Sequence, residues 1–324
     1  MRYAVVAALA AFVLATPADA LTLRLGHNAA PGNPKDEASQ FFAKRVDELS
    51  KGKIKISVGG NAQFGDDVEA LTGLRLGTLD LTANSQGPMA GVVPQFGVIG
   101  LPFLFKTLPA AWKVLDGPIG DELKAEAEKK GIIVLAYWDN GIRHVSNNVR
   151  PITKPDDLKG LKIRTPSDPA TIDTFAALGA NPTPLKFSEL YLALQQGVVD
   201  GQENPLMNIY SSKLHEVQKF ISLTGHKYEM TVFAMSKMVW AKLSDDDKKV
   251  IEQAALEARD LNRKLSAESD NDLRGKIEAS GVKFNEVDPA PFQEMVKSVY
   301  EKWTKEHGAF VERVRAAAAN ASGS

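Results

Sequence analysis

The sequence contains no cysteine in its 324 residues. This absence excludes disulfides, thiolate catalysis, and zinc or iron–sulfur sites built on cysteine. An excess of basic charge is missing too, because 39 Lys and Arg residues face 40 Asp and Glu residues. A net charge of -1 provides no positive field for a phosphate backbone, so we do not expect a nucleic acid partner.

What the chain does contain is typical of a globular protein. Hydrophobic residues make up 44% of it and charged residues 24%, which is too apolar for a disordered chain. The length predicts about two domains, each large enough to bury its own core. A protein of this size can be stable in an oxidising compartment without disulfides.

The first twenty residues have the pattern of a secretory signal peptide. Arg2 precedes an apolar run from Ala4 to Ala15, and Ala18-Asp19-Ala20 is a small-x-small cleavage site. The alternative is a membrane anchor, but the run is shorter than the roughly 20 residues that span a bilayer, and Pro17 interrupts it. No later run is long and apolar enough to span. We therefore predict a signal peptide over residues 1–20 and an exported soluble protein.

Strand-like and helix-like segments alternate along most of the remaining chain. Such alternation indicates parallel pairing and an α/β sheet. Strands are expected at residues 21–25, 53–58, 79–83, 132–136, 161–164, 184–187 and 198–202, and helices at 35–50, 66–76, 118–130, 167–179, 188–196 and from 204. From Ser244 onward a helix is expected to about Ala279, either unbroken or interrupted near Asp270 or Gly275.

Three residues lie where a predicted strand meets a helix start. They are Arg164, Phe187 and Asn204. Ligands of parallel α/β sheets bind outside the carboxyl ends of the strands, where helix N–H groups favour anions, and an arginine there can hold a carboxylate with two hydrogen bonds. Arg143 is a possible second cation. The alternatives are a surface ion pair for Arg164, a core position for Phe187 and a helix cap for Asn204.

No catalytic or metal-binding pattern emerges from the sequence. Ser50-Lys51-Gly52-Lys53 and Ser269-Asp270-Asn271 match two serine β-lactamase motifs, but Ser50 ends a predicted helix and no Lys-Thr-Gly follows. We attribute both matches to chance. The five histidines include no pair at helical metal-ligand spacing. We therefore predict neither an enzyme nor a bound metal or cofactor.

Two longer stretches resemble a known family. DLKGLKIRTPS (157–167) and NPTPLKFSELYLALQQGVVDGQENP (181–205) are similar to the solute-binding subunits of tripartite ATP-independent periplasmic (TRAP) transporters, the DctP-type family. The resemblance also includes LRLGHN (23–28), GKIKISV (52–58) and QFGDD (63–67), and it spans essentially the whole mature chain.

The resemblance implies a two-lobed α/β binding protein with a long helix bridging the lobes. Lobe I would comprise residues 21–141 plus 230–269, and lobe II residues 142–229 plus 270–324. Arg164 matches the arginine that holds the ligand carboxylate, Asn204 an asparagine that helps position it, and Arg143 a second basic residue. Further positions matching residues at the family's pocket are Phe187, Asn28, Asp67 and Ser167. Where sialic-acid-binding relatives carry a glutamate, this chain has Asn84-Ser85, which disfavours sialic acid and adds Ser85 to the polar candidates.

The implied function is the capture of an organic acid in the periplasm. The protein would deliver it to TRAP membrane subunits driven by an ion gradient, and we expect a monomer. The polar candidates favour a sugar acid or uronate. A C4-dicarboxylate or another small carboxylate is the alternative ligand, because Arg143 and Arg164 could each take one carboxylate. A ligand sensor for a membrane kinase is the alternative role, which neighbouring genes for two membrane subunits would argue against.

Overall fold

The computed structural model describes residues 20–322, except for the side chains of residues 270 and 271. The predicted signal peptide, apart from Ala20, lies outside this range. The strands are β1 Leu21–Gly26, β2 Ile54–Gly59, β3 Leu81–Ser85, β4 Ile132–Asn147, β5 Lys162–Thr165, β6 Asn181–Pro184, β7 Gly201–Asn204, β8 Phe220–Ser236 and β9 Lys283–Glu286. The α-helices are α1 Pro34–Leu49, α2 Asp67–Leu76, α3 Gln86–Ala90, α4 Gln95–Ile99, α5 Leu108–Leu115, α6 Pro118–Lys129, α7 Pro169–Ala177, α8 Leu190–Gln195, α9 Leu206–Ser211, α10 Lys237–Trp240, α11 Asp245–Ala279, α12 Ala290–Met295 and α13 Lys297–Ser322. Short 3₁₀ helices are η1 Pro155–Leu158, η2 Phe187–Glu189 and η3 Leu214–Val217.

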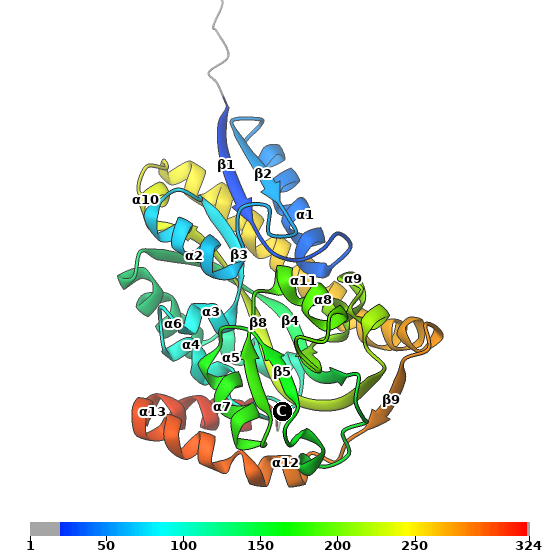
Figure 1. Ribbon diagram of the computed structural model, residues 1–324. Helices are drawn as coiled ribbons and strands as arrows, with labels where there is room; N and C mark the ends of the chain where they lie inside the picture. Colours follow the sequence, from blue (N-terminus) through cyan, green and yellow to red (C-terminus); the bar gives the residue numbers. More distant parts are fainter. Residues whose placement is uncertain (1–19, 323–324) are drawn as a thin grey trace, which may run out of the picture.

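Two long antiparallel strands, β4 and β8, join the molecule's two ends (Figure 1). The strand order is β2-β1-β3-β8-β4-β7-β5-β6, with β9 beside β8. We call β2, β1, β3 and the paired ends of β4 and β8 next to them the first half-sheet. The second half-sheet comprises β7, β5, β6, β9 and the opposite ends of β4 and β8. The pairing of β4 with β8 shifts register between Asp139 and Gly141, and such irregularities bend a strand pair.

The predicted α/β class is confirmed, but the sheet is mixed. β1 pairs in parallel with β2 and β3, and β5 with β6 and β7. β4 and β8 are antiparallel to their partners β7 and β3. The strand predicted at 184–187 is wrong, because β6 ends at Pro184 and Phe187 begins the 3₁₀ helix η2. β3 and β7 also begin later than predicted, since Gly77 and Gly197 in the left-handed conformation lead into turns before them.

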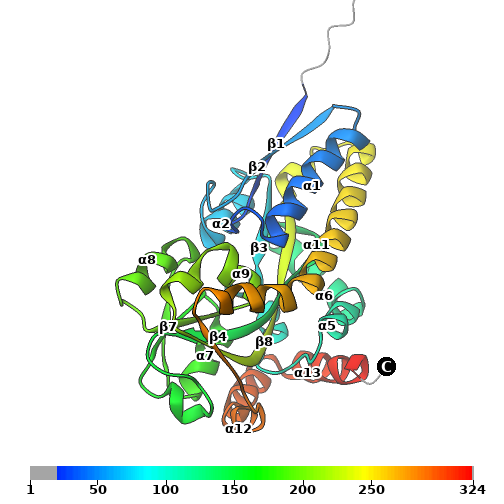
Figure 2. The same cartoon turned by 90° about the vertical axis from the view of Figure 1, so that its right-hand side faces the viewer.

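The unbroken alternative for the long helix is confirmed. α11 runs from Asp245 to Ala279, and the hydroxyl of its N-cap Ser244 accepts a hydrogen bond from the amide of Asp247. Figure 2 shows α11 crossing the side of the molecule, beside α1 at one end and α9 at the other. α13 packs against α4 and α5 and also against α7. Both helices therefore contact elements that flank each half-sheet.

The first half-sheet has a dense aromatic core. The indole of Trp138 stacks on Phe233 with ring centroids 4.2 Å apart, and Phe42 of α1 meets Phe233 edge-on at 4.8 Å. All three side chains are fully buried. Aromatic pairs of this kind add about 0.5–1.5 kcal/mol beyond the burial of their area. This core fixes β4 and β8 under α1 and α11, just ahead of the register shift.

Candidate functional site

Polar side chains from both half-sheets meet in one cavity at the carboxyl ends of β1, β3, β5 and β7. This is the edge where open α/β sheets bind ligands. The cavity is lined by Asn28, Ala29, Lys35, Asp67, Ser85, Asn140, Arg143, Arg164, Pro166, Phe187, Asn204, Asn208 and Glu229. The volume of this cavity is only about 20 Å³. A ligand of several carbons therefore requires the walls to separate first.

Arg164, on β5, contributes a positive charge without an anionic partner. Its Nε and Nη2 atoms donate to the carbonyl oxygen of Leu185, at 3.0 and 2.7 Å. The guanidinium carbon lies 5.7 Å from the centroid of the Phe187 ring, within the range of a cation–π contact. Among the described residues no carboxylate forms an ion pair with it. Burial, together with the like charge of Arg143, lowers the pKa of Arg164 to about 10, so it stays charged at neutral pH.

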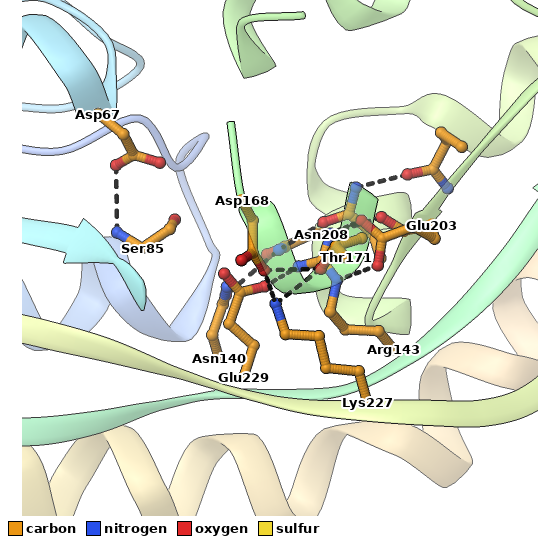
Figure 3. Close-up of polar contacts among 12 residues, drawn as sticks. Asp67, Ser85, Asn140, Arg143, Asp168, Thr171, Glu203, Asn208, Lys227 and Glu229 are labelled. Carbon is orange, nitrogen blue, oxygen red and sulfur yellow. Dashed lines mark hydrogen bonds and ion pairs between the residues drawn. The ribbon is translucent and has the colours of Figure 1, made fainter. Parts of the chain in front are cut away.

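Arg143, on β4, differs from Arg164 because its guanidinium forms ion pairs with two carboxylates. Its Nη2 atom donates to the side chain of Glu203 at 2.6 Å, and further ion pairs join it to Glu203 and Glu229 (Figure 3). Burial alone would lower the pKa of Arg143, but these two negative charges outweigh it and raise that pKa. Burial would likewise raise the pKa of Glu203, but Arg143 and His226 lower it to about 2. The charge of Arg143 is thus already compensated.

Asparagine side chains connect the floor of the cavity. Asn208 of α9 donates to the side-chain oxygens of Asn204, at 3.1 Å, and of Asn140, at 3.2 Å. Asn204 donates to Gln202 at 2.5 Å. Asn33, the N-cap of α1, donates to Asn208 at 2.9 Å. This network fixes the orientation of Asn204 and joins α9 to the start of α1.

The wall from the first half-sheet combines Asn28, Asp67 and Ser85 with the buried Lys35. Asn28 donates to Asp67 at 2.8 Å, and the amide of Ser85 donates to the other oxygen of Asp67 at 3.2 Å. The ammonium of Lys35 lies 3.4 Å from both the Asn28 oxygen and the Ser85 hydroxyl. Burial raises the pKa of Asp67 and lowers that of Lys35, while their mutual attraction opposes both shifts.

The structure brings seven of the eight predicted site residues into this cavity and leaves Ser167 outside it. The side chain of Ser167 is exposed, and it borders a smaller neighbouring cavity. The helix predicted at 188–196 also begins differently, because Phe187–Glu189 form η2 and α8 runs from Leu190 to Gln195. Within η2 the Ser188 amide donates to Asp66, at 2.8 Å.

Sequence reasoning missed four lining residues with polar side chains, namely Lys35, Asn140, Asn208 and Glu229. One signal for Lys35 was present: it follows Asn33-Pro34 in the first turn of a helix, where the positive end of the dipole disfavours a cation. The described residues contain no cluster of three or more His, Asp or Glu side chains suited to a metal ion. Within residues 20–322, no helix combines the length and apolar character needed to cross a membrane.

Comparison with known proteins identifies the family of this chain. Residues 25–306 match the family described as "Bacterial extracellular solute-binding protein, family 7", or DctP. The chain belongs to this family. As a family 7 protein it is 38% identical over 277 residues to the 2,3-diketo-L-gulonate-binding periplasmic protein YiaO of Escherichia coli, covering 86% of this chain and 84% of YiaO.

A family 7 structure from Advenella mimigardefordensis has the same fold. This sugar acid binding protein, DctPAm, was solved with galactonate and superposes with a TM-score of 0.91 at 38% identity, covering 93% of this chain and 99% of that one. Protein y4mM of Sinorhizobium fredii is 49% identical over 300 residues, covering 92% of this chain. This chain spans only 55% of the length of y4mM.

Proposed function

We propose that the protein is a periplasmic receptor for a sugar acid or uronate, which it delivers to an ion-gradient-driven TRAP permease. The main support is the contrast between the two buried arginines. Arg164 has no carboxylate partner among the described residues, whereas Arg143 has two. A buried guanidinium needs hydrogen-bonding anions to offset its lost hydration, and a ligand carboxylate would supply one at Arg164.

The charges around the cavity favour one ligand carboxylate over two. Three cations (Lys35, Arg143 and Arg164) line the cavity with two carboxylates, Asp67 and Glu229. Glu203 and Asp66 add negative charge close behind them. A second ligand carboxylate would therefore add a negative charge that no further lining cation compensates. Hydroxyl groups, unlike a second carboxylate, can donate to Asp67. For this reason we place a C4-dicarboxylate, with Arg143 as a second carboxylate site, behind a hydroxylated monocarboxylate.

The residues we assign to ligand binding are Arg164, Asn204, Arg143, Phe187, Asn28, Asp67 and Ser85, with Ser167 at the rim. Arg164 would hold the carboxylate while Asn204 takes part of its remaining hydrogen bonds. Phe187 would pack against an apolar ligand face. Arg143 would act mainly through its neighbours, since Glu203 and Glu229 already occupy its donors.

Closure around the ligand follows from the proposed lobes, 21–141 plus 230–269 and 142–229 plus 270–324. A ligand that touches both lobes binds the closed form better than the open form, and so shifts the population toward closure. We propose that the protein acts as a monomeric binding protein and not as an enzyme; the similar proteins DctPAm and YiaO are themselves binding proteins.

Replacing Arg164 tests this function. Arg164→Ala should weaken the binding of D-galactonate by 30-fold or more, because truncating one partner of a buried charge pair costs about 2–5 kcal/mol. Arg164→Lys should also weaken it, since an ammonium cannot make the two-pronged contact. Isothermal titration would measure both variants, with the exposed Arg75→Ala as the control. Near-normal binding by Arg164→Ala would refute the carboxylate site.

Ligand-induced thermal stabilisation provides a second readout for the same variants. A ligand at about 100 times its dissociation constant stabilises the folded protein by roughly 2.7 kcal/mol. Wild type and Arg75→Ala should show this shift with D-galactonate, and Arg164→Ala should not. A screen in which only hydroxyl-free dicarboxylates stabilise the wild type would contradict the sugar-acid assignment.

A further inference from the structure

Lys35 is a buried cation that the carboxylate site does not require. It occupies the second position of α1, after Asn33 and Pro34, and is only 3% exposed. The first turn of a helix carries the positive end of the dipole and favours acidic side chains. A lysine here is therefore unfavourable both for its burial and for its place on the helix.

The contacts of Lys35 do not offset this cost. Its ammonium group has three donors, and it makes long hydrogen bonds to the Asn28 oxygen and the Ser85 hydroxyl, both at 3.4 Å. No carboxylate of the described residues forms an ion pair with it. Burial lowers the pKa of Lys35, although the charges of Asp67 and Glu229 oppose this shift. The ammonium is thus aimed into the cavity and only weakly bonded in the protein.

The groups beside Lys35 are those that bind hydroxyls. Asp67 is an acceptor, Asn28 carries both a donor and an acceptor, and the Ser85 hydroxyl can serve as either. Asn28 and the Ser85 amide already donate hydrogen bonds to Asp67, at 2.8 and 3.2 Å. Neighbouring ligand hydroxyls could accept from Lys35 and donate to Asp67 at the same time.

We propose that Lys35 determines ligand specificity by donating hydrogen bonds to the hydroxylated end of a sugar acid. It would do so from the wall facing the carboxylate site of Arg164. This inference rests on the proposed function, since it presumes that Arg164 holds the carboxylate. A second carboxylate at Lys35 would approach the negative charges of Asp67 and Glu229. Hydroxyl oxygens avoid that repulsion and still accept the ammonium's hydrogen bonds.

The test compares Lys35→Met with wild type, using D-galactonate and two six-carbon acids without hydroxyls, hexanoate and adipate. Lys35→Met should bind D-galactonate at least tenfold more weakly, while any binding of hexanoate stays within about twofold. Because the substitution removes a poorly paired buried charge, the ligand-free variant should unfold at the same or a higher temperature. A merely structural lysine would show the reverse, with lower stability and equal losses for all acids.

Lys44→Met on the exposed side of the same helix is the matched control, since the Lys44 side chain is 78% exposed. Lys35→Gln provides a second variant should Lys35→Met fail to fold. Unchanged D-galactonate affinity in a folded Lys35 variant would overturn the inference while Arg164→Ala still tests the proposed function. A selective loss of adipate binding would assign Lys35 to a second carboxylate instead. Wild type that binds none of these acids, and neither D-galacturonate nor D-glucuronate, would refute the proposed function itself.

Discussion

At the scale of single residues, Glu203 shows how a buried charge comes to stabilise the fold. Glu203 is fully buried, and its partners are Arg143 and His226. Its pKa of about 2 in the folded protein lies below the ordinary value of 4.5. A lowered folded-state pKa means that Glu203 contributes stability above about pH 4.5 and loses it as the pH falls toward 2.

Glu203→Gln should therefore destabilise the protein at pH 7 and change its response to acid. Breaking a buried pair leaves Arg143 with less compensation, at a cost of about 3–5 kcal/mol, and the pKa difference corresponds to roughly 3 kcal/mol. Urea unfolding at pH 7 and at pH 3 would measure this, with exposed Glu252→Gln as the control. The gap between variant and wild type should shrink at pH 3; a constant gap would rule out the charge of Glu203 as the cause.

The two buried arginines show which features of the site can be predicted from the sequence. The position of Arg164 in the site was predictable because it depends on nearby sequence only. The residue ends a predicted strand, and a helix start follows directly. The pairing of Arg143 was not predictable, since Glu203 and Glu229 lie 60 and 86 residues away in the chain. Periodicity carries no information about contacts between such distant strands. Sequence analysis therefore treated both arginines as available to a ligand carboxylate, whereas the structure pairs Arg143 with two carboxylates and leaves Arg164 without an ion pair among the described residues.

At the scale of secondary structure elements, local signals predicted α11 but not the two long strands. The Ser244 cap and the lack of proline specify the helix from nearby residues. The strand predicted at 132–136 instead continues to Asn147 through three register shifts against β8. Each shift interrupts the alternation on which strand prediction depends, so the length of β4 depends on its partner.

α11 supports this irregular region through Asn262. The side-chain oxygen of Asn262 accepts a hydrogen bond from the amide of Asp139, at 2.6 Å, next to a register shift. Asn262→Ala would leave that buried amide without this acceptor, and the expected loss is about 1–3 kcal/mol of unfolding free energy. Urea denaturation would measure it, with the exposed Gln253→Ala on the same helix as control. Equal stability of the two variants would contradict a supporting role for Asn262.

At the scale of the whole molecule, contacts across the cavity hold the two halves together. Asp66, the N-cap of α2, accepts a hydrogen bond from the Ser188 amide at 2.8 Å. Near it, the Lys186 ammonium lies 2.5 Å from Glu69. Asn33 donates to Ser211 at 3.2 Å on another side of the cavity. Sequence patterns could not predict these contacts, because they form between segments more than a hundred residues apart.

Asp66→Ser would separate closure from folding. Serine remains a good N-cap for α2, but its shorter side chain cannot also reach Ser188. The closed form should lose the charge-assisted hydrogen bond from the Ser188 amide. Asn28 also donates to Asp66, at 2.9 Å, but it should keep its bond to Asp67 in the variant. The affinity for D-galactonate should therefore fall about tenfold, corresponding to roughly 1.4 kcal/mol. In the proposed closure of the lobes this contact forms after the ligand has entered, so the change should appear mainly in the dissociation rate.

Stopped-flow measurement of D-galactonate dissociation, with thermal unfolding of the ligand-free protein, would test this expectation. Asp121→Ser is the control, because Asp121 lies in the first turn of α6 and its side chain is 74% exposed. Faster dissociation with unchanged ligand-free stability would identify Asp66 as a closure contact. Unchanged dissociation would mean that the Ser188 contact does not stabilise the ligand-bound closed state. Equal losses of stability and affinity would instead assign Asp66 to the folding of α2 alone.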